Sequence, residues 1–476
     1  MSPRGLADGG TAFATMSQEG GLRAPERHPV RWEEAEYTDR ASLEKEAARV
    51  FDICHGCRRC FNLCAAFPLL FDAVDETPGG EVGELGREVA WKVAEQCYLC
   101  DLCFMTKCPY VPPHPFALDF PKLMLRLKAT RFREEGLRPR DRLLTATDAV
   151  GRLLGVPVVA PAVNALARNR AARRTLEAVA GVAREEPLPP YASRSFRARR
   201  RKAPKSPPRS VAGERTRGRV ALFVTCYANR NEPEIAQDLV RVFEHNGIVV
   251  DPVPEEICCG MPRFEHGDLE TVAAHARRNL PVLARLVDEG YELTAPVPSC
   301  VLMFRRELPL LLPDDPLAAK VAAAFRDPFE YLMLRARDGL LCKDFKRPLG
   351  EVVYHAPCHQ RVQNIGPRTR EFLELIPGTR VRAIERCSGH DGTYAVRRET
   401  HPHAVAIGRP VFAAVREAPE AVVTSDCPMA GRHIAWGGGH APAVHPLRLA
   451  AVAYGLVDPA GLHPSPSSPP EPPCAL

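Results

Sequence analysis

Two cysteine runs decide the fold of the N-terminal part, CHGCRRCFNLC at residues 54–64 and CYLCDLCFMTKC at residues 97–108. In each run three cysteines are separated by two residues, and a fourth cysteine follows three or four residues later. Three thiolates at this spacing can surround one face of a 4Fe–4S cluster, while the fourth reaches the other cluster in two-cluster ferredoxins. The spacing therefore predicts two clusters with crossed ligand sets. One set is Cys54, Cys57, Cys60 and Cys108, and the other is Cys97, Cys100, Cys103 and Cys64.

Disulfides and zinc are the two alternatives for these cysteines. The N-terminus lacks the apolar core of a signal peptide, and the chain has an odd number of cysteines, 17 in all. Both features favour a reduced cytoplasmic chain in which clustered cysteines bind metal. Zinc needs four ligands at each site and has no use for a third cysteine at the same interval. Iron–sulfur clusters are therefore the preferred interpretation.

Length and composition suggest several domains. The chain has 476 residues, 45% apolar and 26% charged, which is typical of globular proteins and corresponds to about three domains. A net charge of +6 is too small by itself to indicate nucleic-acid binding. Bunched prolines and basic residues mark linkers. The expected segments are a mobile tail (1–45), a ferredoxin domain (46–125), a helical connector (126–190), a basic proline-rich linker (191–218), two modules (219–345 and 346–457) and a proline-rich tail (458–476).

The C-terminal half contains an internal duplication. RVALFVTC at 219–226 corresponds to EVVYHAPC at 351–358, and each segment is a buried strand that ends in a cysteine. Helical stretches and two further strands follow in both copies, so each copy is expected to form a parallel α/β sheet. The predicted fold class is thus α+β and multidomain, a helical dicluster ferredoxin followed by two α/β modules.

The repeated cysteines lie at the carboxyl ends of the predicted strands, where ligands of parallel sheets gather. The first module offers four thiolates, Cys226, Cys258, Cys259 and Cys300, enough for an iron–sulfur cluster or a zinc ion. The second offers Cys358, Cys387 and Cys427, with His359 and His390 nearby in sequence. An imidazole, with His390 as the predicted fourth ligand, could complete a zinc site or a cluster, and a cluster could also keep an open ligand position. His401 and His403 precede a helix and are expected on the surface. The sequence identifies no catalytic residue.

The duplicated pattern Cys…Cys-Cys-Gly…Cys behind a dicluster ferredoxin resembles the cysteine-rich CCG domain family. The strings CRRCFNLC, CYLCDLC, CPYVPPH and CSGHDGTY carry the resemblance, together with the module cysteines. That family includes iron–sulfur subunits of anaerobic glycerol-3-phosphate dehydrogenase, glycolate oxidase and heterodisulfide reductase. The chain departs from the family motif where Ser388 stands in place of a cysteine, and where Val297 and Thr424 occupy the first position of the final C-x2-C.

The resemblance implies an electron-transfer subunit. Its clusters would relay electrons between a flavin-bearing dehydrogenase and a quinone or disulfide acceptor. No G-x-G-x-x-G fingerprint occurs, which agrees with a separate flavoprotein partner. The alternative is a reductase that acts on a disulfide or small acceptor at the module metal site. Residues 120–181 are expected to be helical and amphipathic, so peripheral contact with the inner face of the cytoplasmic membrane is a second expectation.

Overall fold

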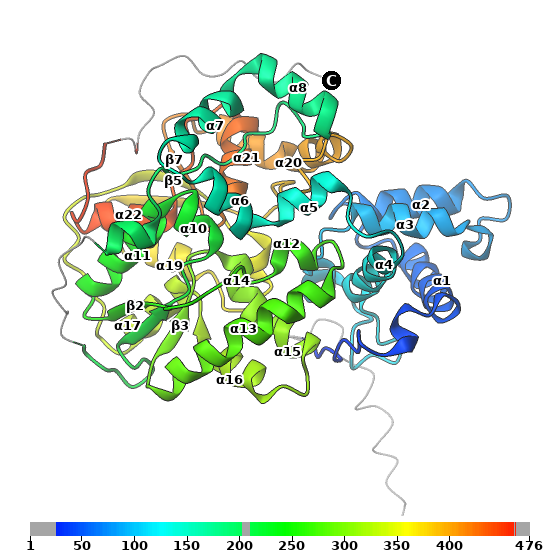
Figure 1. Ribbon diagram of the computed structural model, residues 1–476, viewed down its shortest axis with the longest axis horizontal. Helices are drawn as coiled ribbons and strands as arrows, with labels where there is room; N and C mark the ends of the chain where they lie inside the picture. The colour runs from blue at the N-terminus through cyan, green and yellow to red at the C-terminus, as the bar shows by residue number, and fades with distance from the viewer. Residues whose placement is uncertain (1–24, 202–209, 461, 463–476) are drawn as a thin grey trace, which may run out of the picture. The chain divides into compact units, whose positions relative to one another are not determined.

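The computed structural model describes residues 25–201, 210–460 and 462. The chain divides into two compact units, Met1–Lys128 and Ala129–Leu476, and the division falls within helix α4 (Figure 1). Residues 1–24 and 463–476 of the predicted tails, and 202–209 of the predicted basic linker, lie outside the described residues.

The first unit is helical, as the ferredoxin prediction requires. Its elements are η1 (Ala35–Thr38), α1 (Arg40–Cys57), α2 (Ala66–Asp75), η2 (Val82–Glu84), α3 (Arg87–Gln96), the π-helical turn η3 (Cys103–Lys107) and the start of α4 (Phe120–Glu135). The Asp39 side chain caps α1 by accepting the Ser42 N–H at 2.7 Å. Phe67 stacks on Phe120 with ring centroids 4.6 Å apart, which closes the helices over a small aromatic core.

Part of the predicted N-terminal tail has defined structure. Residues 25–45 include η1 and the beginning of α1. The Arg27 guanidinium binds Asp101 at 2.5 Å and Asp119 at 3.0 Å, and it lies 4.2 Å from the ring centre of Phe104. These contacts attach the segment to the loop of the second cysteine run.

Among the described residues of the second unit, the end of α4 and five further helices precede the first module. The five are α5 (Pro139–Thr145), α6 (Thr147–Leu154), α7 (Val159–Arg168), α8 (Arg170–Ala180) and α9 (Phe196–Arg200). Phe196, which lies within the predicted basic linker, is buried in the core of the modules. In the part of the chain that the structure describes, no single helix is long and apolar enough to cross a membrane. Helices α6 and α7 pass that test only together, and they are bent by 107°.

The first module forms the predicted parallel sheet. Its elements are β1 (Arg219–Leu222), α10 (Cys226–Arg230), α11 (Pro233–His245), β2 (Val249–Pro252), α12 (Met261–Phe264), α13 (Leu269–Asp288), β3 (Glu292–Thr294), α14 (Pro298–Leu302), the π-helical turn η4 (Met303–Glu307), α15 (Leu308–Leu311), α16 (Pro316–Ala324), β4 (Phe325–Arg326) and α17 (Pro328–Arg337). The strand order is β2-β1-β3-β4, and all pairs are parallel. In the register, Val220 pairs with Val250 on one side and with Glu292 on the other.

The second module repeats this topology, which confirms the predicted duplication of the fold. Its elements are β5 (Gly350–His355), α18 (Cys358–Arg361), α19 (Arg368–Glu374), β6 (Thr379–Ile384), α20 (His401–Arg416), β7 (Val422–Ser425), α21 (Pro428–Gly438) and α22 (Pro446–Ala453). The strand order is β6-β5-β7, again all parallel. In both modules the first strand is central, and the chain crosses from one side of it to the other. A crevice forms at the carboxyl ends of the strands at such a switch point.

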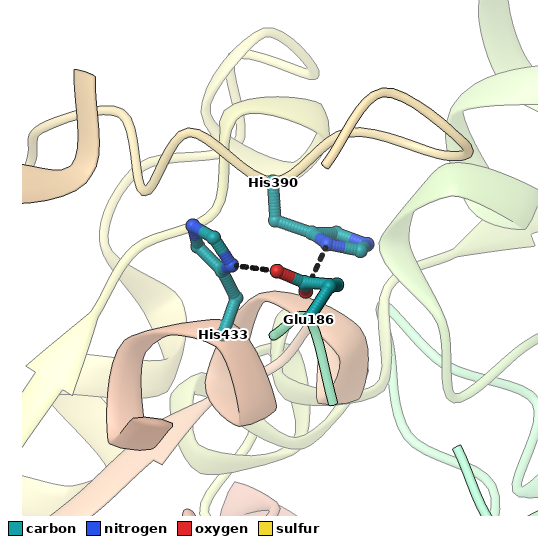
Figure 2. Close-up of side chains that lie close together, drawn as sticks. All are labelled: Glu186, His390 and His433. Atoms are coloured by element: carbon teal, nitrogen blue, oxygen red, sulfur yellow. Dashed lines mark hydrogen bonds and ion pairs between the residues drawn. The ribbon is translucent and has the colours of Figure 1, made fainter. Parts of the chain in front are cut away.

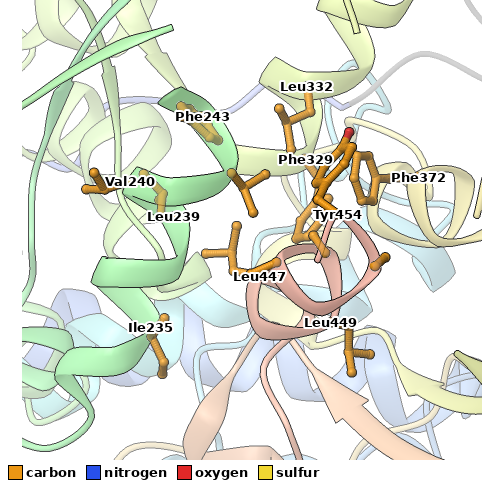
Figure 3. Close-up of a cluster of buried hydrophobic side chains, with 14 of the residues drawn as sticks. Ile235, Leu239, Val240, Phe243, Phe329, Leu332, Phe372, Leu447, Leu449 and Tyr454 are labelled. Atoms are coloured by element: carbon orange, nitrogen blue, oxygen red, sulfur yellow. The ribbon is translucent and has the colours of Figure 1, made fainter. Parts of the chain in front are cut away.

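A single hydrophobic core joins the two modules (Figure 3). Leu239 and Phe243 of α11 belong to the first module, and Leu447 of α22 belongs to the second. All three are fully buried in the same cluster. Phe329 and Phe372, one from each module, make an edge-to-face contact with centroids 5.2 Å apart. Because this core is shared, the carboxyl ends of the two sheets are held in a defined relation to each other.

Candidate metal centres

One group of thiols in the first unit gathers around Cys54. Cys54 and Cys57 lie on the last turn of α1, which ends where Arg58 adopts a left-handed conformation with φ 50°. Burial raises the pKa of the Cys54 thiol, and nearby Cys108, Cys60 and Cys57 raise it further. The neighbours of Cys54 are therefore the residues that the crossed arrangement assigns to one cluster.

A second group of thiols gathers around Cys103 at the start of η3. Burial raises the pKa of Cys103 well above its usual value, and Cys97, Cys60 and Cys64 add to this effect. Cys64 comes from the first run and lies beside cysteines of the second run, as crossed ligation requires. Cys60 neighbours both groups. Cys100 lies between Leu99 and Asp101, which both adopt left-handed conformations.

The donor chemistry of this unit fits iron–sulfur clusters. All eight of its cysteines are free thiols. The Leu99 N–H points at Cys97 Sγ at 3.5 Å, and backbone N–H groups of Tyr110 and Val111 bind the Cys108 sulfur. Hydrogen bonds from N–H groups stabilise sulfur that carries negative charge, and they tune cluster potentials. Buried thiols packed together resist ionisation, and cation binding relieves that cost.

In the first module, four thiols meet at the carboxyl ends of three strands. Cys226 begins α10 directly after β1, Cys258 and Cys259 follow β2, and Cys300 lies in α14 after β3. Thr225, which precedes the first of them, has φ 72°, and its side chain caps α10 by accepting the Ala228 N–H at 3.1 Å. This turn directs the chain from the sheet into the short cysteine-bearing helix.

Hydrogen bonds among these thiols favour one thiolate at Cys258. Bonds from Cys226 and Cys259 lower the pKa of Cys258, and a further bond from His275 supports this against the opposing effect of burial. The same contacts, together with burial, raise the pKa of Cys226 and Cys259. The Cys258 N–H also donates to Asp148 Oδ2 of α6 at 2.5 Å. Four thiols in mutual contact match the donor set of a thiolate-bound metal.

In the second module, three thiols and a carboxylate come together. Cys358 begins α18, Cys387 follows β6 and Cys427 caps α21. Burial raises the pKa of Cys358 well above its usual value, and raises the pKa of Cys387 and of Cys427 to about 11. The charge of Asp391 contributes to all three shifts. Asp391 is therefore the acidic neighbour that the three cysteines share.

The histidines of this module contact other partners. Nδ1 of His390, the predicted fourth ligand, lies 3.6 Å from Glu186 Oε1, and the His390 ring borders His433. His355 is buried with hydrogen bonds to Ser425 Oγ and Arg386 O at 3.0 Å, and burial lowers its pKa to about 4. The prediction that His401 lies on the surface is wrong. Its ring is buried, and the hydrogen bond between its Nδ1 and the carbonyl oxygen of Ala395, at 2.9 Å, satisfies a polar atom of the ring there.

Both sets of module cysteines open onto one cavity of about 280 Å³. The cysteines that line it are Cys226, Cys258, Cys259, Cys300, Cys358, Cys387 and Cys427. Its wall also includes apolar side chains of the preceding helices, Leu143, Leu144 and Val150, as well as His390 and Asp391. Ser299 Oγ and His359 Nδ1, which are next to Cys300 and Cys358 in the chain, are hydrogen-bonded at 2.8 Å. The duplication thus produces one shared site.

Comparison with known families agrees with this arrangement. The Fer4-like domain model of citrate utilization protein B matches residues 47–135. The cysteine-rich CCG domain model matches twice, at residues 220–305 and 352–432, which contain the seven cysteines of the cavity. The chain carries a Fer4-like domain and two CCG domains. These domains indicate iron–sulfur clusters, and they correspond to the first unit and to the two modules.

Individual relatives are oxidoreductase subunits and metabolic proteins. The chain is 29% identical to a subunit of the anaerobic glycerol-3-phosphate dehydrogenase of Escherichia coli K12 over 311 residues, which cover 63% of this chain and 74% of that protein. It is 27% identical to lactate utilization protein A of Bacillus pumilus over 38% of this chain and 75% of that protein. For lactate utilization protein A of Bacillus thuringiensis the identity is 26%, covering 44% and 87%. This chain, with its Fer4-like domain and two CCG domains, is thus similar in sequence to a dehydrogenase subunit.

Sequence reasoning missed two acidic residues of the CCG half. Asp391 follows the predicted ligand His390 directly, but the pattern of cysteines does not distinguish between the two neighbours. Glu186 lies in the predicted connector, far from any cysteine in sequence, and its carboxylate is buried against the second CCG module. Glu186 belongs to no cysteine motif and to no repeated pattern, so nothing in the sequence marks it as a residue of the site.

Proposed function

We propose that this chain is the iron–sulfur electron-transfer subunit of an oxidoreductase complex. It would relay electrons between a flavin-dependent dehydrogenase and a quinone or another acceptor. The observation that carries the proposal is the convergence of seven CCG cysteines on one cavity, in a chain that also has eight free thiols in a Fer4-like unit. Iron–sulfur clusters bound by such thiolates transfer single electrons.

The eight cysteines of the first unit would hold two 4Fe–4S clusters. The crossed sets are supported by the neighbours of two thiols, since Cys108 lies by Cys54 and Cys64 lies by Cys103. Phe67 and Phe104 of the same unit are buried and would help to keep water out of its interior. Backbone N–H groups on Cys97 and Cys108 would stabilise the charged thiolates.

The CCG modules would hold a further cluster or a zinc ion. In the first module the ligands would be its four cysteines, whose thiols are linked by hydrogen bonds that favour the thiolate form of Cys258. In the second module the three thiols would bind the metal together with the carboxylate of Asp391, because the charge of Asp391 acts on these cysteines. Ligation by His390 stays a prediction, and its contact with Glu186 makes Asp391 the stronger candidate.

The cavity between the modules would bind the acceptor. Leu143, Leu144 and Val150 give its lining apolar side chains suited to a hydrophobic ring, and the seven cysteines belong to the same lining. A quinone fits this description. The same cavity supports the second candidate function, reduction of a disulfide or small molecule, because Asp391 replaces a fourth thiolate and gives the second module a different donor set from the first.

The relatives support the proposed partner, and the surface supports the proposed location. One relative is a subunit of a glycerol-3-phosphate dehydrogenase, so a flavoprotein dehydrogenase is the proposed partner, and glycerol-3-phosphate is the leading candidate for its substrate. The helices before the first module expose apolar side chains, notably Leu153, Val158 and Leu166. These residues would touch the inner face of the cytoplasmic membrane and bring the cavity near a quinone dissolved there.

The test combines metal analysis with spectroscopy of cysteine variants. After strictly anaerobic purification of the full chain, iron, sulfide and zinc are measured, and EPR spectra are recorded on the reduced protein. Two ferredoxin clusters correspond to about eight irons per chain, and a further cluster in the modules to about twelve. Cys108→Ser should change the same EPR signal as Cys54→Ser, whereas Cys64→Ser should change the signal that Cys97→Ser changes.

Cys342→Ser is the matched control, because Cys342 lies outside every proposed ligand set and donates to the His245 carbonyl. It should leave all signals unchanged. Zinc bound to sulfur in place of iron throughout would overturn the electron-transfer proposal. To separate the two functions, the reduced protein is offered a quinone analogue or a disulfide. Reduction of the disulfide alone, lost in Cys259→Ser, would favour the second candidate.

A further inference from the structure

Three buried side chains that lie apart in sequence meet beside the second module (Figure 2). Glu186 comes from the segment after α8, His390 from the loop after β6, and His433 from α21. Glu186 Oε2 lies 2.7 Å from His433 Nδ1, and Glu186 Oε1 lies 3.6 Å from His390 Nδ1. One ligand atom from each residue lies within 4.8 Å of the other two.

The burial of this group is nearly complete. The side chains of Glu186 and His433 are 1% and 0% exposed, and that of His390 is 6% exposed. Among the described residues, both ring nitrogens of His390 and Nε2 of His433 have no hydrogen-bond partner. Buried polar atoms are nearly always paired, and His390 Nδ1 faces the Glu186 carboxylate at 3.6 Å, which is beyond hydrogen-bond range. A bound cation would therefore supply the partner that accepts its lone pair.

The surrounding structure positions Glu186 for these histidines. The Arg173 guanidinium donates to the backbone carbonyls of Glu186 and Ala183, at 2.7 and 2.5 Å, and so fixes the segment. The Glu186 carboxylate oxygens face histidines, since His401 Nδ1 also lies 3.6 Å from Oε2. Because Arg173 binds the main chain, it leaves the carboxylate to the imidazoles.

We propose that Glu186, His390 and His433 bind one divalent transition-metal ion, with zinc as the expected ion. Two imidazoles and one carboxylate form a donor set that zinc uses when it keeps a fourth position for another ligand. With bonds of 2.0–2.2 Å, tetrahedral ligand atoms lie roughly 3.3 Å apart. The 3.6 Å spacing of His390 and Glu186 already matches this, and the 2.7 Å contact to His433 would widen by about half an ångström.

This site is separate from the cysteine sites and does not depend on the electron-transfer proposal. It contains nitrogen and oxygen donors only, whereas the module cysteines offer sulfur together with Asp391. His390 also lines the cavity that holds the cysteines, so an ion here would lie at its edge. A positive charge at that edge would attract an electron-rich oxygen of a bound acceptor.

X-ray absorption at the zinc edge tests the site directly, because the iron of the clusters does not contribute there. The anaerobic full-length protein is given one equivalent of Zn²⁺ and freed from excess. Relative to the protein before the addition, we expect about one further zinc per chain with nitrogen and oxygen neighbours at about 2.0 Å. Zinc held by the module thiols would show its sulfur shell at about 2.3 Å both before and after the addition. No bound zinc, or zinc with sulfur neighbours only, would overturn the proposal without the need for any variant.

Two variants then assign the ligands. Glu186→Gln and His433→Asn should each weaken zinc binding at least tenfold while iron content stays at the native level. His245→Asn is the matched control, since His245 belongs to the more exposed group with Cys342 and Asp344, and it should bind zinc as the native chain does. Zinc should also raise the unfolding temperature of the native chain and not that of His433→Asn. Native-like nitrogen-bound zinc in both variants would contradict the assignment.

Discussion

Ser299 Oγ and His359 Nδ1 are hydrogen-bonded at 2.8 Å, although they belong to different CCG modules. Ser299 precedes Cys300 on α14, and His359 follows Cys358 on α18. The bond therefore joins the two helices that present cysteines to the common cavity. It links the cysteine-bearing helices of the two duplicated modules, which lie far apart in the sequence.

Removal of this bond should loosen the two modules against each other. Ser299→Ala leaves the buried Nδ1 of His359 without its partner, so we expect a loss of about 1–2 kcal/mol in stability. Chemical unfolding of the anaerobic protein measures it. Ser210→Ala is the control, since Ser210 is exposed and its bond to Gly218 O should contribute less than about 0.5 kcal/mol. Equal losses of unfolding free energy in the two variants would show that the hydrogen bond between the modules contributes no more to stability than an exposed one.

Gly389, between Ser388 and His390, should tolerate no side chain. Its φ is +83°, and a Cβ there would lie 1.9 Å from the carbonyl oxygen of Ala404. Gly389→Ala should therefore cost about 3 kcal/mol or more and should disturb the loop that carries Cys387. Gly290 has φ +90° but open space around it, so Gly290→Ala should cost only the backbone strain of about 1–2 kcal/mol. Comparable losses in the two unfolding midpoints would contradict the close contact with Ala404.

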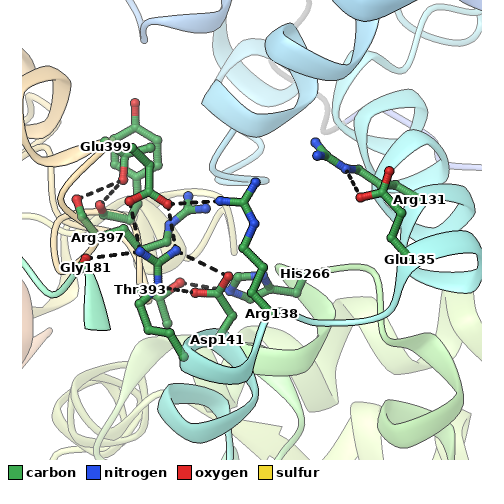
Figure 4. Close-up of polar contacts among 12 residues, drawn as sticks. Arg131, Glu135, Arg138, Asp141, Gly181, His266, Thr393, Arg397 and Glu399 are labelled. Carbon is green, nitrogen blue, oxygen red and sulfur yellow. Dashed lines mark hydrogen bonds and ion pairs between the residues drawn. The ribbon is translucent and has the colours of Figure 1, made fainter. Parts of the chain in front are cut away.

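The Glu399 carboxylate, whose polar contacts Figure 4 draws, is paired with Arg140, and this pair should make stability depend on pH. Burial raises the pKa of Glu399, but two hydrogen bonds and the charge of Arg140 outweigh this and lower the pKa to about 2. A lowered carboxyl pKa contributes stability that is complete above the unfolded value of about 4.3 and is lost as the pH falls towards 2. Because Glu399 is 41% exposed, the contribution is about 1 kcal/mol.

Glu399→Gln should therefore destabilise the protein at pH 7, and its difference from the native chain should shrink between pH 5 and pH 2. Unfolding midpoints across this range provide the measurement. Glu417→Gln, which removes a more exposed partner of Arg382, should change stability by less than about 0.5 kcal/mol. A difference that stays constant with pH would rule out the shifted Glu399 carboxyl as its source.

The exposed apolar residues around α6 and α7 should support binding to lipid. Val158 is 85% exposed. Val158→Glu removes one apolar contact and adds a charge, so binding to vesicles with anionic lipid should weaken about tenfold. Flotation of the full chain with such vesicles measures the effect. Val211→Glu, which changes a less exposed valine outside these helices, should bind like the native chain. Native protein that does not float would exclude the proposed membrane contact.

Local sequence patterns predicted much of the fold, because they depend on short-range rules. The cysteine spacing predicted a helical N-terminal unit, and the structure places the two runs at the end of α1 and around η3. Strands ending at Cys226 and Cys358 predicted two parallel sheets, which β1 and β5 confirm. Alternation of strands and helices determines parallel pairing, since each crossover returns the chain in the same direction.

Relations between distant segments could not be predicted in this way. Nothing in the duplicated pattern indicates that Ser299 meets His359, or that both cysteine sets share a cavity. Asp391 and His390 are neighbours in the chain, yet the tertiary structure directs one towards the cysteines and the other towards Glu186. Backbone geometry of a loop, and not residue type, decides between such adjacent side chains.

The sequence by itself determined the candidate metal ligands by type and spacing, namely the two cysteine runs and the repeated module cysteines, and the parallel sheets that carry the latter. Those features are encoded within a few turns of helix or strand, where periodicity and ligand spacing are sufficient. Tertiary structure alone decided that the modules pack through one core, that their cysteines face one cavity, and that Glu186 joins His390 and His433. These contacts join segments up to 247 residues apart, and such contacts form only when burial of the shared core brings them together.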